Sequence, residues 1–389
     1  MDFTSDADHE EIRRGIRRLC AKFDDDYWMG CDNEKRYPIE FHREVAEQGW
    51  FGLTVPVEYG GGGLGVTEAA IVEQEIAASG AGMNGCSAVH NGIFGLEPII
   101  RHGSAELKAW ALRELIRPDV HLAFAVTEPD AGTDTSRITT FAKPVDGGFL
   151  ISGKKVWISK AQEAQWMLLL CRTTSRGEDG RKPTDGMTLF LAPLDRERVE
   201  VRLIAKMGRN AVDSNELFID NLFVPARNVV GEVGSGFRCL LSGLNAERVI
   251  SANAAIGIGR AALRKASSYV RERVVFDRPI GANQSVSFPL AQACMRLDAA
   301  DLLVTKAAWM IDHDIACARE ANAAKFLAAD AAFEAADAAL TAHGGYGYAK
   351  EYHVERYFRE ARLMKIAPIS QNLVLSYIAE HVMGLPRGY

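Results

Sequence analysis

The pattern of apolar residues changes twice along the chain, and this change constrains the fold more than any other feature of the sequence. Residues 1–120 repeat apolar positions at helical spacing. Residues 121–230 contain short strand-like runs separated by Gly, Pro and Asp clusters. Helical spacing then returns over 231–389. The sequence therefore predicts an α+β protein with an N-terminal all-α domain, a central antiparallel β domain and a C-terminal bundle resembling four-helix bundles.

Runs within each segment set the expected elements. Helices are expected at 10–22, 39–48, 66–78, 244–275, 289–315, 321–343 and 367–381. Strands are expected at 122–127, 148–152, 166–172, 187–192, 199–203 and 215–224. Two dipeptides, Asp146-Gly147 and Asp185-Gly186, predict hairpin turns.

The composition excludes several classes of function. The chain has 389 residues, 48% of them apolar, and a net charge of -6, which argues against nucleic acid as a partner. It contains no uncharged apolar run of about 18 residues, so we expect no membrane insertion. The first residues are acidic, unlike a signal peptide. The seven cysteines show no CxxC spacing, which favours reduced thiols in a cytoplasmic protein and indicates no metal site.

Two polar motifs lie in the β segment. The run 127–134, Thr-Glu-Pro-Asp-Ala-Gly-Thr-Asp, enters a turn whose N–H groups and small hydroxyls can face a polar ring edge or an anion. Trp157 and Ser159 lie two residues apart, so in a strand both side chains point to one face. An indole can cover a flat ring, and a hydroxyl can donate to a ring nitrogen. An ordinary β-turn and a core tryptophan are the alternatives.

Two further motifs flank the C-terminal helices. Arg273 stands three residues before Phe276, and Gln284 follows a Pro-Ile-Gly turn. A guanidinium suits phosphate because it can donate two parallel hydrogen bonds, although a solvated arginine at a helix end is the alternative. Gly344 and Gly345 begin a GGxG turn, which either lets a ligand approach the backbone or caps a helix.

The order and separation of these motifs resemble the acyl-CoA dehydrogenase family over nearly the whole chain. The resemblance implies FAD as cofactor, acyl-CoA as substrate, an electron-transfer flavoprotein as partner, a homotetramer and a place in fatty acid metabolism. The residues that it assigns to FAD are Thr127, Gly132, Thr133, Trp157, Ser159, Arg273, Phe276, Gln284, Gly344, Gly345, Ser370 and Asn372. Those that it assigns to the substrate are Thr133, Asn245, Arg248 and Ile369.

The resemblance also assigns roles to some of these residues. Trp157 covers the flavin, and Ser159 stands where relatives usually carry a Thr that donates to flavin N5. Arg273 contacts the FAD pyrophosphate. The turn that begins at Gly344 meets FAD bound mainly to a neighbouring subunit, and Thr341 stands where the family often has Gln.

Glu247 is the expected catalytic base. Many family members carry their carboxylate in a C-terminal Tyr-Glu-Gly-Thr motif, but the corresponding run here, 366–370, reads Ile-Ala-Pro-Ile-Ser. Pro368 lacks the carboxylate, and it also lacks the backbone N–H that relatives direct to the thioester oxygen. Glu247 and Arg248 match the Glu-Arg pair that supplies the base in an isovaleryl-CoA dehydrogenase-like subset. A helix carboxylate in an ordinary ion pair is the alternative.

The expected reaction is α,β-dehydrogenation of an acyl-CoA thioester. A carboxylate removes the α proton, and the β hydrogen leaves as hydride to flavin N5, which gives the trans-2-enoyl-CoA. A flavin oxidase or monooxygenase on the same fold is one alternative, and a non-catalytic acyl-CoA- and FAD-binding member is another. The sequence does not select the acyl chain.

Overall fold

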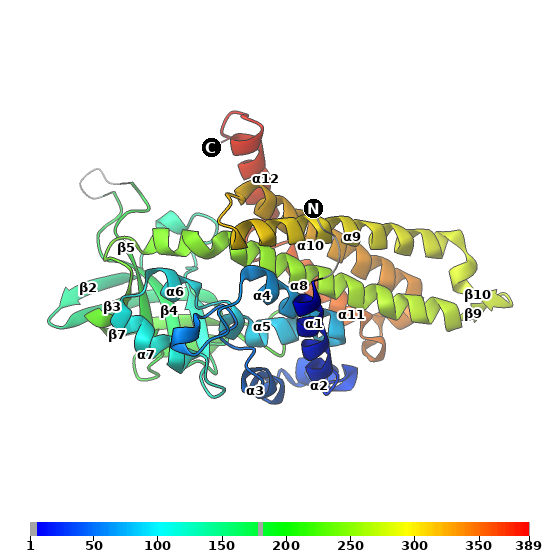
Figure 1. Cartoon of the computed structure of the whole chain (residues 1–389), viewed down its shortest axis with the longest axis horizontal. Coiled ribbons are helices and arrows are strands. Elements are labelled where there is room, and N and C mark those ends of the chain that lie inside the picture. Colours follow the sequence, from blue (N-terminus) through cyan, green and yellow to red (C-terminus); the bar gives the residue numbers. More distant parts are fainter. Residues whose placement is uncertain (1–5, 178–181, 389) are drawn as a thin grey trace.

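The computed structural model describes residues 6–177 and 182–388, and it confirms the expected α+β class (Figure 1). The β sheet lies at one end of the molecule. Long C-terminal helices run from the sheet to the opposite end, and the N-terminal helices pack beneath their middle.

Short helices form the N-terminal part. The Asp6 carboxylate accepts a hydrogen bond from the Asp8 N–H and so caps the first helix, whose Ile16 and Leu19 are buried as their spacing predicts. The helices are α1 (Ala7–Cys20), α2 (Asp25–Glu34), α3 (Ile39–Glu47), α4 (Val66–Ile76), α5 (Gly82–Ile93), α6 (Glu97–His102) and α7 (Ala105–Leu115), with a 3₁₀ turn at Val57–Tyr59 and a π turn at Ala77–Ala81.

The central part is an eight-stranded sheet in the order β6-β7-β3-β2-β4-β5-β8, with β1 beside β4. Most neighbouring strands are antiparallel, as expected, but β1 and β2 both pair with β4 in parallel. The strands are β1 (Leu122–Ala125), β2 (Phe141–Val145), β3 (Gly148–Ser159), β4 (Trp166–Arg172), β5 (Met187–Pro193), β6 (Val199–Leu203), β7 (Ser214–Pro225) and β8 (Val229–Val230), with 3₁₀ turns at Thr135–Arg137 and Ala226–Asn228.

Small residues let the C-terminal helices approach closely. Ala328 and Ala332 are fully buried, and a Cβ on Gly259 would lie only 3.2 Å from the Ala332 Cα. The elements are α8 (Gly236–Glu272), β9 (Val274–Val275), β10 (Arg278–Pro279), α9 (Gln284–Asp312), α10 (Ala318–His343), α11 (Val354–Met364) and α12 (Gln371–Tyr377). Short helical turns lie at Ile280–Ala282, Gly344–Tyr348, Lys350–Tyr352 and Ile378–Val382.

Several expected elements are wrong in their bounds. The strand expected at 148–152 runs to Ser159, and the helix expected at 289–315 spans Gln284–Asp312. The helix expected at 367–381 begins only at Gln371, because Ser370 caps it and Pro368 cannot donate a backbone hydrogen bond. The helix expected at 244–275 runs from Gly236 to Glu272. Asp185-Gly186 forms no two-residue hairpin, since the connection between β4 and β5 spans 173–186.

The structure bears on two further expectations from the composition. The seven cysteines are unpaired, and all but Cys294 are buried. Across the described ranges 6–177 and 182–388, we find no helix with both the length and the apolar character needed to cross a membrane.

Candidate active site

The end of β3 has a strained backbone. Trp157 and Lys160 adopt left-handed φ angles of 63° and 64°, and the pairing of β3 with β7 shifts register between Lys155 and Ile158. Such conformations cost roughly 1–3 kcal/mol each in bulky residues and concentrate at functional sites. The consequence here is that the Trp157 side chain is 58% exposed, whereas that of its neighbour Ile158 is 1% exposed.

The loop that carries the Thr127 motif lies against this strained segment. The Val156 N–H donates to the Thr127 carbonyl at 2.9 Å. Gly132 and Thr133, further along the loop, are exposed. The hydrogen bond therefore brings the two β-segment motifs next to each other.

A buried ion pair holds this loop in place. Lys155 Nζ donates to Glu128 Oε1 at 2.9 Å and to the Val126 carbonyl, and both charged side chains are almost fully buried. Burial favours the neutral form of Glu128, but Lys155 and the N–H groups of Thr139 and Thr140 outweigh it and lower the pKa of Glu128. The carboxylate is therefore a fixed anchor for the loop.

Glu247 is half-buried on α8, and charged side chains near it act on its carboxylate. Burial raises its pKa, while His90 and Arg248 oppose that rise. His90, on α5, lies 3.4 Å from the buried carboxylate of Glu73 on α4. Burial opposes the charge on His90, yet Glu73 and Glu247 together raise the pKa of His90. The charges on Glu73, His90 and Glu247 are thus coupled.

The same region lies beside the end of β3. Lys160, which follows Ser159, donates to the Ala88 carbonyl on α5 at 2.8 Å. Burial lowers the pKa of Lys160 to about 7, and the charge of Lys160 opposes the rise in the pKa of His90. The end of β3 and Glu247 therefore both lie close to α5.

The residues expected to contact substrate lie around the next turn of α8 and the start of α12. Arg248 Nη1 donates to Asn245 Oδ1 at 2.9 Å. The buried Lys325 donates to the Ile369 carbonyl at 2.5 Å. Burial and the nearby charge of Arg248 lower the pKa of Lys325 to about 8. Ser370 Oγ accepts from the Leu373 N–H.

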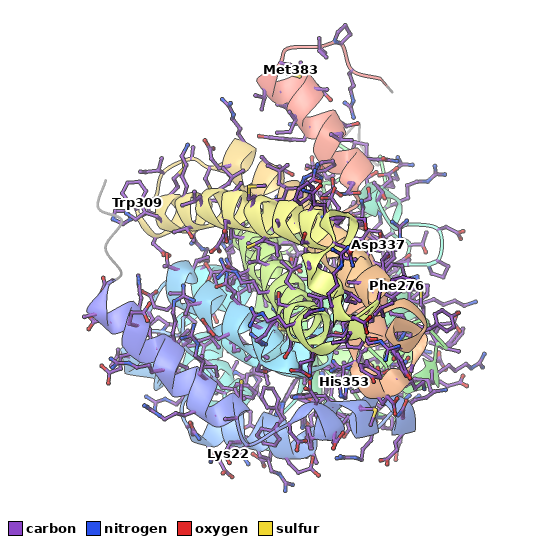
Figure 2. All side chains as sticks on the ribbon, turned by 90° about the vertical axis from the view of Figure 1, so that its right-hand side faces the viewer. Lys22, Phe276, Trp309, Asp337, His353 and Met383 are labelled. Atoms are coloured by element: carbon purple, nitrogen blue, oxygen red, sulfur yellow. The ribbon has the colours of Figure 1, made fainter. Side chains whose placement is uncertain are left out.

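The remaining predicted residues gather at the other end of α8. The Arg273 guanidinium lies 5.7 Å from the centroid of the Tyr346 ring, which brings the segment before β9 to the turn at Gly344 and Gly345. Phe276 is 93% exposed. Figure 2 looks onto this end of the bundle and labels Phe276. A rise of about 1.5 Å per residue puts Arg273 roughly 40 Å from Glu247 along the helix.

Sequence reasoning did not find Lys155, Glu128, His90, Glu73 or Arg209. Each is a common polar residue to which the sequence assigned no role, although Glu128 lies within the 127–134 motif. Their partners lie far away in the sequence, so no spacing could reveal them. The one local signal is position, since Glu128, Lys155 and Lys160 each lie within two residues of a predicted site residue.

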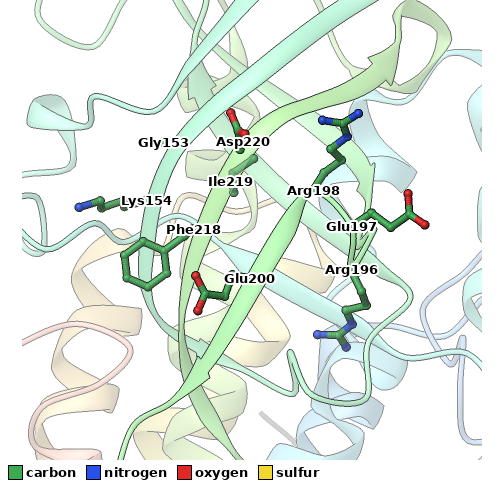
Figure 3. Close-up of a pocket in the computed structure, with 9 residues that line it drawn as sticks. All are labelled: Gly153, Lys154, Arg196, Glu197, Arg198, Glu200, Phe218, Ile219 and Asp220. Atoms are coloured by element: carbon green, nitrogen blue, oxygen red, sulfur yellow. The ribbon is translucent and has the colours of Figure 1, made fainter.

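Two surface pockets lie outside this region. One, of about 420 Å³, is an open groove on the sheet lined by charged side chains such as Lys154, Arg198 and Glu200 (Figure 3). The other, of about 550 Å³, lies between α1, α2, α4 and α8, where it is lined by Arg17, Glu75 and other residues. Neither contains Glu247, Trp157 or Ser159.

Comparison with known proteins identifies the family. The acyl-CoA dehydrogenase N-terminal domain matches residues 6–119, the middle domain 123–222 and the C-terminal domain 234–383. The acyl-CoA dehydrogenase FadE12 of Mycobacterium tuberculosis is 34% identical over 391 residues, covering 100% of this chain and 99% of the relative. The chain belongs to the acyl-CoA dehydrogenase family. This acyl-CoA dehydrogenase is therefore an oxidoreductase acting on CH–CH bonds.

Other relatives support the same family and fold. Benzylmalonyl-CoA dehydrogenase of Aromatoleum aromaticum is 33% identical over 388 residues, which is 98% of this acyl-CoA dehydrogenase and 100% of that relative. A glutaryl-CoA dehydrogenase solved with glutaryl-CoA superposes with a TM-score of 0.90 at 29% identity and covers 100% of this chain and 98% of the other.

The residues at the end of β3 fit a flat cofactor with a polar edge. The exposed Trp157 indole offers a face, and the Ser159 oxygen already accepts a hydrogen bond from Arg209, so its O–H is left to donate outward. A Cβ on Gly132 would meet no atom within 4 Å, so the loop leaves open space there. This donor set suits a flavin in the acyl-CoA dehydrogenase.

Proposed function

We propose that this protein is an FAD-dependent acyl-CoA dehydrogenase that forms a trans-2-enoyl-CoA and passes its electrons to an electron-transfer flavoprotein. The observation that carries the proposal is that two groups lie beside α5: half-buried Glu247, whose charge acts on His90, and the end of β3, where Lys160 donates to the Ala88 carbonyl. When bound, FAD would supply a two-electron acceptor at flavin N5. Trp157 covers the flavin, Ser159 donates to N5, and Thr127, Gly132 and Thr133 line the neighbouring loop.

Glu247 is the proposed base, in the position used by isovaleryl-CoA dehydrogenase-like members. A base needs a pKa near the working pH, and burial raises the pKa of Glu247 in that direction. His90 and Arg248 keep the carboxylate partly stabilised. A bound acyl chain would exclude water and increase the effect of burial.

The thioester oxygen needs a hydrogen-bond donor, and Pro368 cannot supply one. We assign this role to the Ile369 N–H, since Lys325 holds the Ile369 carbonyl and so fixes this turn. A donor in such a position is typically worth about 3 kcal/mol in the transition state. Asn245 and Arg248, bonded to each other on α8, contact the rest of the substrate, and Ser370 and Asn372 contact FAD.

The distance along α8 supports a cofactor shared between subunits. Arg273 lies roughly 40 Å from Glu247 along α8. We therefore assign a separate role to the cofactor residues at that end of the helix: Arg273, Phe276, Gln284, Gly344 and Gly345. They would bind the nucleotide part of FAD in a second copy.

An apolar stripe offers a surface for that second copy. Four large side chains on α9 recur every seven residues, directly opposite the buried face of the helix, and are 50–67% exposed: Phe288, Met295, Leu302 and Trp309. Figure 2 labels Trp309 at this surface. We propose that the protein is a homotetramer, and light scattering of the native protein would give its mass.

Anaerobic mixing with a panel of acyl-CoA thioesters tests the proposed function. A dehydrogenase loses its flavin absorbance on reduction by at least one thioester, and adding an electron-transfer flavoprotein restores it. An oxygen-dependent monooxygenase would show no bleaching without oxygen. Bound FAD that no thioester bleaches would instead support the non-catalytic alternative.

A further inference from the structure

Arg209, in the connection between β6 and β7, bridges the last paired residues of β3 and β7. Its Nη1 donates to Ser159 Oγ at 3.0 Å, and its Nη2 donates to Ser214 Oγ at 2.6 Å. Ser159 and Ser214 lie opposite each other in the β3–β7 ladder. One guanidinium therefore fixes two hydroxyls across a strand pair.

The backbone of Arg209 is strained in the same way as that of its neighbours on β3. Its φ angle is 56°, close to the values for Trp157 and Lys160. A bulky residue keeps such a conformation only where its surroundings hold it there. Three strained residues thus surround the hydroxyl of Ser159.

The charge of Arg209 has no close counter-ion. Within residues 6–177 and 182–388, no carboxylate forms an ion pair with it, and Asp213 and Glu360 act only at longer range. Its buried Nε has no hydrogen-bond partner in that part of the chain. Burial lowers the pKa of Arg209, but a guanidinium stays protonated in proteins. A positive charge therefore persists beside Ser159.

Hydrogen-bond chemistry sets the direction of the Ser159 hydroxyl. A guanidinium only donates, so the Ser159 oxygen accepts and its single O–H must point to another acceptor. Under the proposed function, that acceptor is flavin N5. The arrangement is therefore a short relay from a fixed cation, through one hydroxyl, to the atom that receives the hydride.

We propose that Arg209 is a positioning residue for flavin reduction, which orients the Ser159 O–H toward N5 and stabilises the negative charge that the flavin gains. The inference rests on FAD binding beside Ser159. The substrate loses a hydride, with both electrons, to N5 and its α proton to Glu247, while Arg209 and Ser159 exchange no proton. A positive charge near N5 favours the reduced flavin and raises its midpoint potential.

The midpoint potential of the bound flavin tests this inference without any substrate. We expect R209Q to disfavour the reduced flavin by about tenfold, because the variant removes a positive charge that acts through a partly buried site. For a two-electron couple, tenfold corresponds to a potential about 30 mV lower. R209K keeps the charge and should restore most of the potential. R202Q, at an exposed arginine on β6, is the matched control and should leave the potential unchanged.

A second variant tests the relay through the hydroxyl. S159A should lower the potential, and R209Q should add less in the S159A background than in the native protein. The inference is wrong if R209Q shifts the potential no more than R202Q, or if its effect is undiminished in S159A. Should R209Q fail to fold or to hold FAD, an unchanged potential in S159A overturns the inference.

The two proposals fail in different ways. A native protein that binds no FAD, or whose flavin no thioester bleaches, contradicts the proposed function. A native flavin that a thioester bleaches, together with an unshifted potential in R209Q, contradicts only the role of Arg209.

Discussion

The two ends of α8 differ in how completely one chain builds them. Around Glu247, charged groups are half-buried, coupled to one another and enclosed by α4, α5 and the end of β3. Around Arg273, the predicted cofactor residues are exposed on a short hairpin, and Phe276 is 93% exposed (Figure 1). At the Glu247 end, burial shifts the pKa values of the charged groups. At the Arg273 end, the predicted cofactor residues are exposed, and no other part of the described chain covers them.

Under the proposed shared cofactor site, the Glu247 end depends on the fold of its own chain, whereas the Arg273 end depends on a second copy. Turnover and its pH dependence at the Glu247 end should change when residues of the same chain are replaced. FAD affinity at the Arg273 end should fall when a replacement removes the neighbouring copy. Variants that act on one end only can therefore test whether the two ends depend on different copies.

The largest effect is expected at Glu247. E247Q keeps the size of the side chain but cannot accept a proton, so kcat for the best thioester should fall by about 10²–10⁴-fold. Steady-state turnover with an artificial electron acceptor measures this. E272Q, an exposed glutamate at the other end of α8, should leave kcat unchanged. Full turnover in E247Q would remove Glu247 from the mechanism.

The position of the loop that carries Thr127 should depend on the buried ion pair of Lys155 and Glu128. K155M leaves the Glu128 carboxylate buried without its counter-ion, which should lower the free energy of unfolding by about 3–5 kcal/mol. Urea denaturation measures the loss. K154M, at the exposed neighbouring lysine, should change stability by less than about 0.5 kcal/mol. Equal losses in the two variants would contradict an anchoring role for the buried pair.

We expect the apolar stripe on α9 to hold the second copy, which the cofactor residues near Arg273 need in order to bind FAD. L302E puts a charge into the proposed contact, so the assembly should dissociate. FAD affinity should then fall at least about tenfold, because contacts from the second copy are lost. Light scattering and FAD titration measure the two effects. V57E, at an exposed valine outside the stripe, is the control. A dissociated protein with undiminished FAD affinity would refute a shared cofactor site.

The sequence predicted the fold well because periodicity is a local signal. Spacings of 3.6 and 2 residues located most helices and strands, and the bounds of 166–172 and 199–203 are the observed ones. The failures have local causes too. The apolar pattern continues back to 367, but the helix begins at Gln371. Pro368 has no backbone N–H to donate, and the Ser370 side chain caps the helix start.

The candidate site was only partly predictable, for a physical reason. Trp157 and Ser159 share one short motif, so the sequence shows them together. Arg209 and His90 act through contacts that only tertiary packing creates: Arg209 reaches Ser159 across the sheet, and His90 meets Glu73 between two helices. No periodicity encodes such contacts, although they set the charges around the reacting groups.

The smallest predicted effect, a shift in pH dependence, distinguishes the coupled charges around Glu247. A carboxylate base works above its pKa and fails as the pH falls through it. Because burial raises the pKa of Glu247, the acid limb of kcat/KM should lie above the ordinary glutamate value of about 4.3. H90N removes a charge that lowers the pKa of Glu247, so the limb should move to higher pH.

Glu73 should act on the same limb only through His90. In E73Q, His90 loses the carboxylate that raises its pKa, so His90 gives up its proton at lower pH and stabilises the Glu247 carboxylate less. The limb should again move to higher pH, but by less than in H90N, and E73Q should add nothing once His90 is replaced. Profiles of kcat/KM for the three variants measure this, with H313N at an exposed histidine as control. Additive shifts from E73Q and H90N would show that Glu73 acts on Glu247 directly.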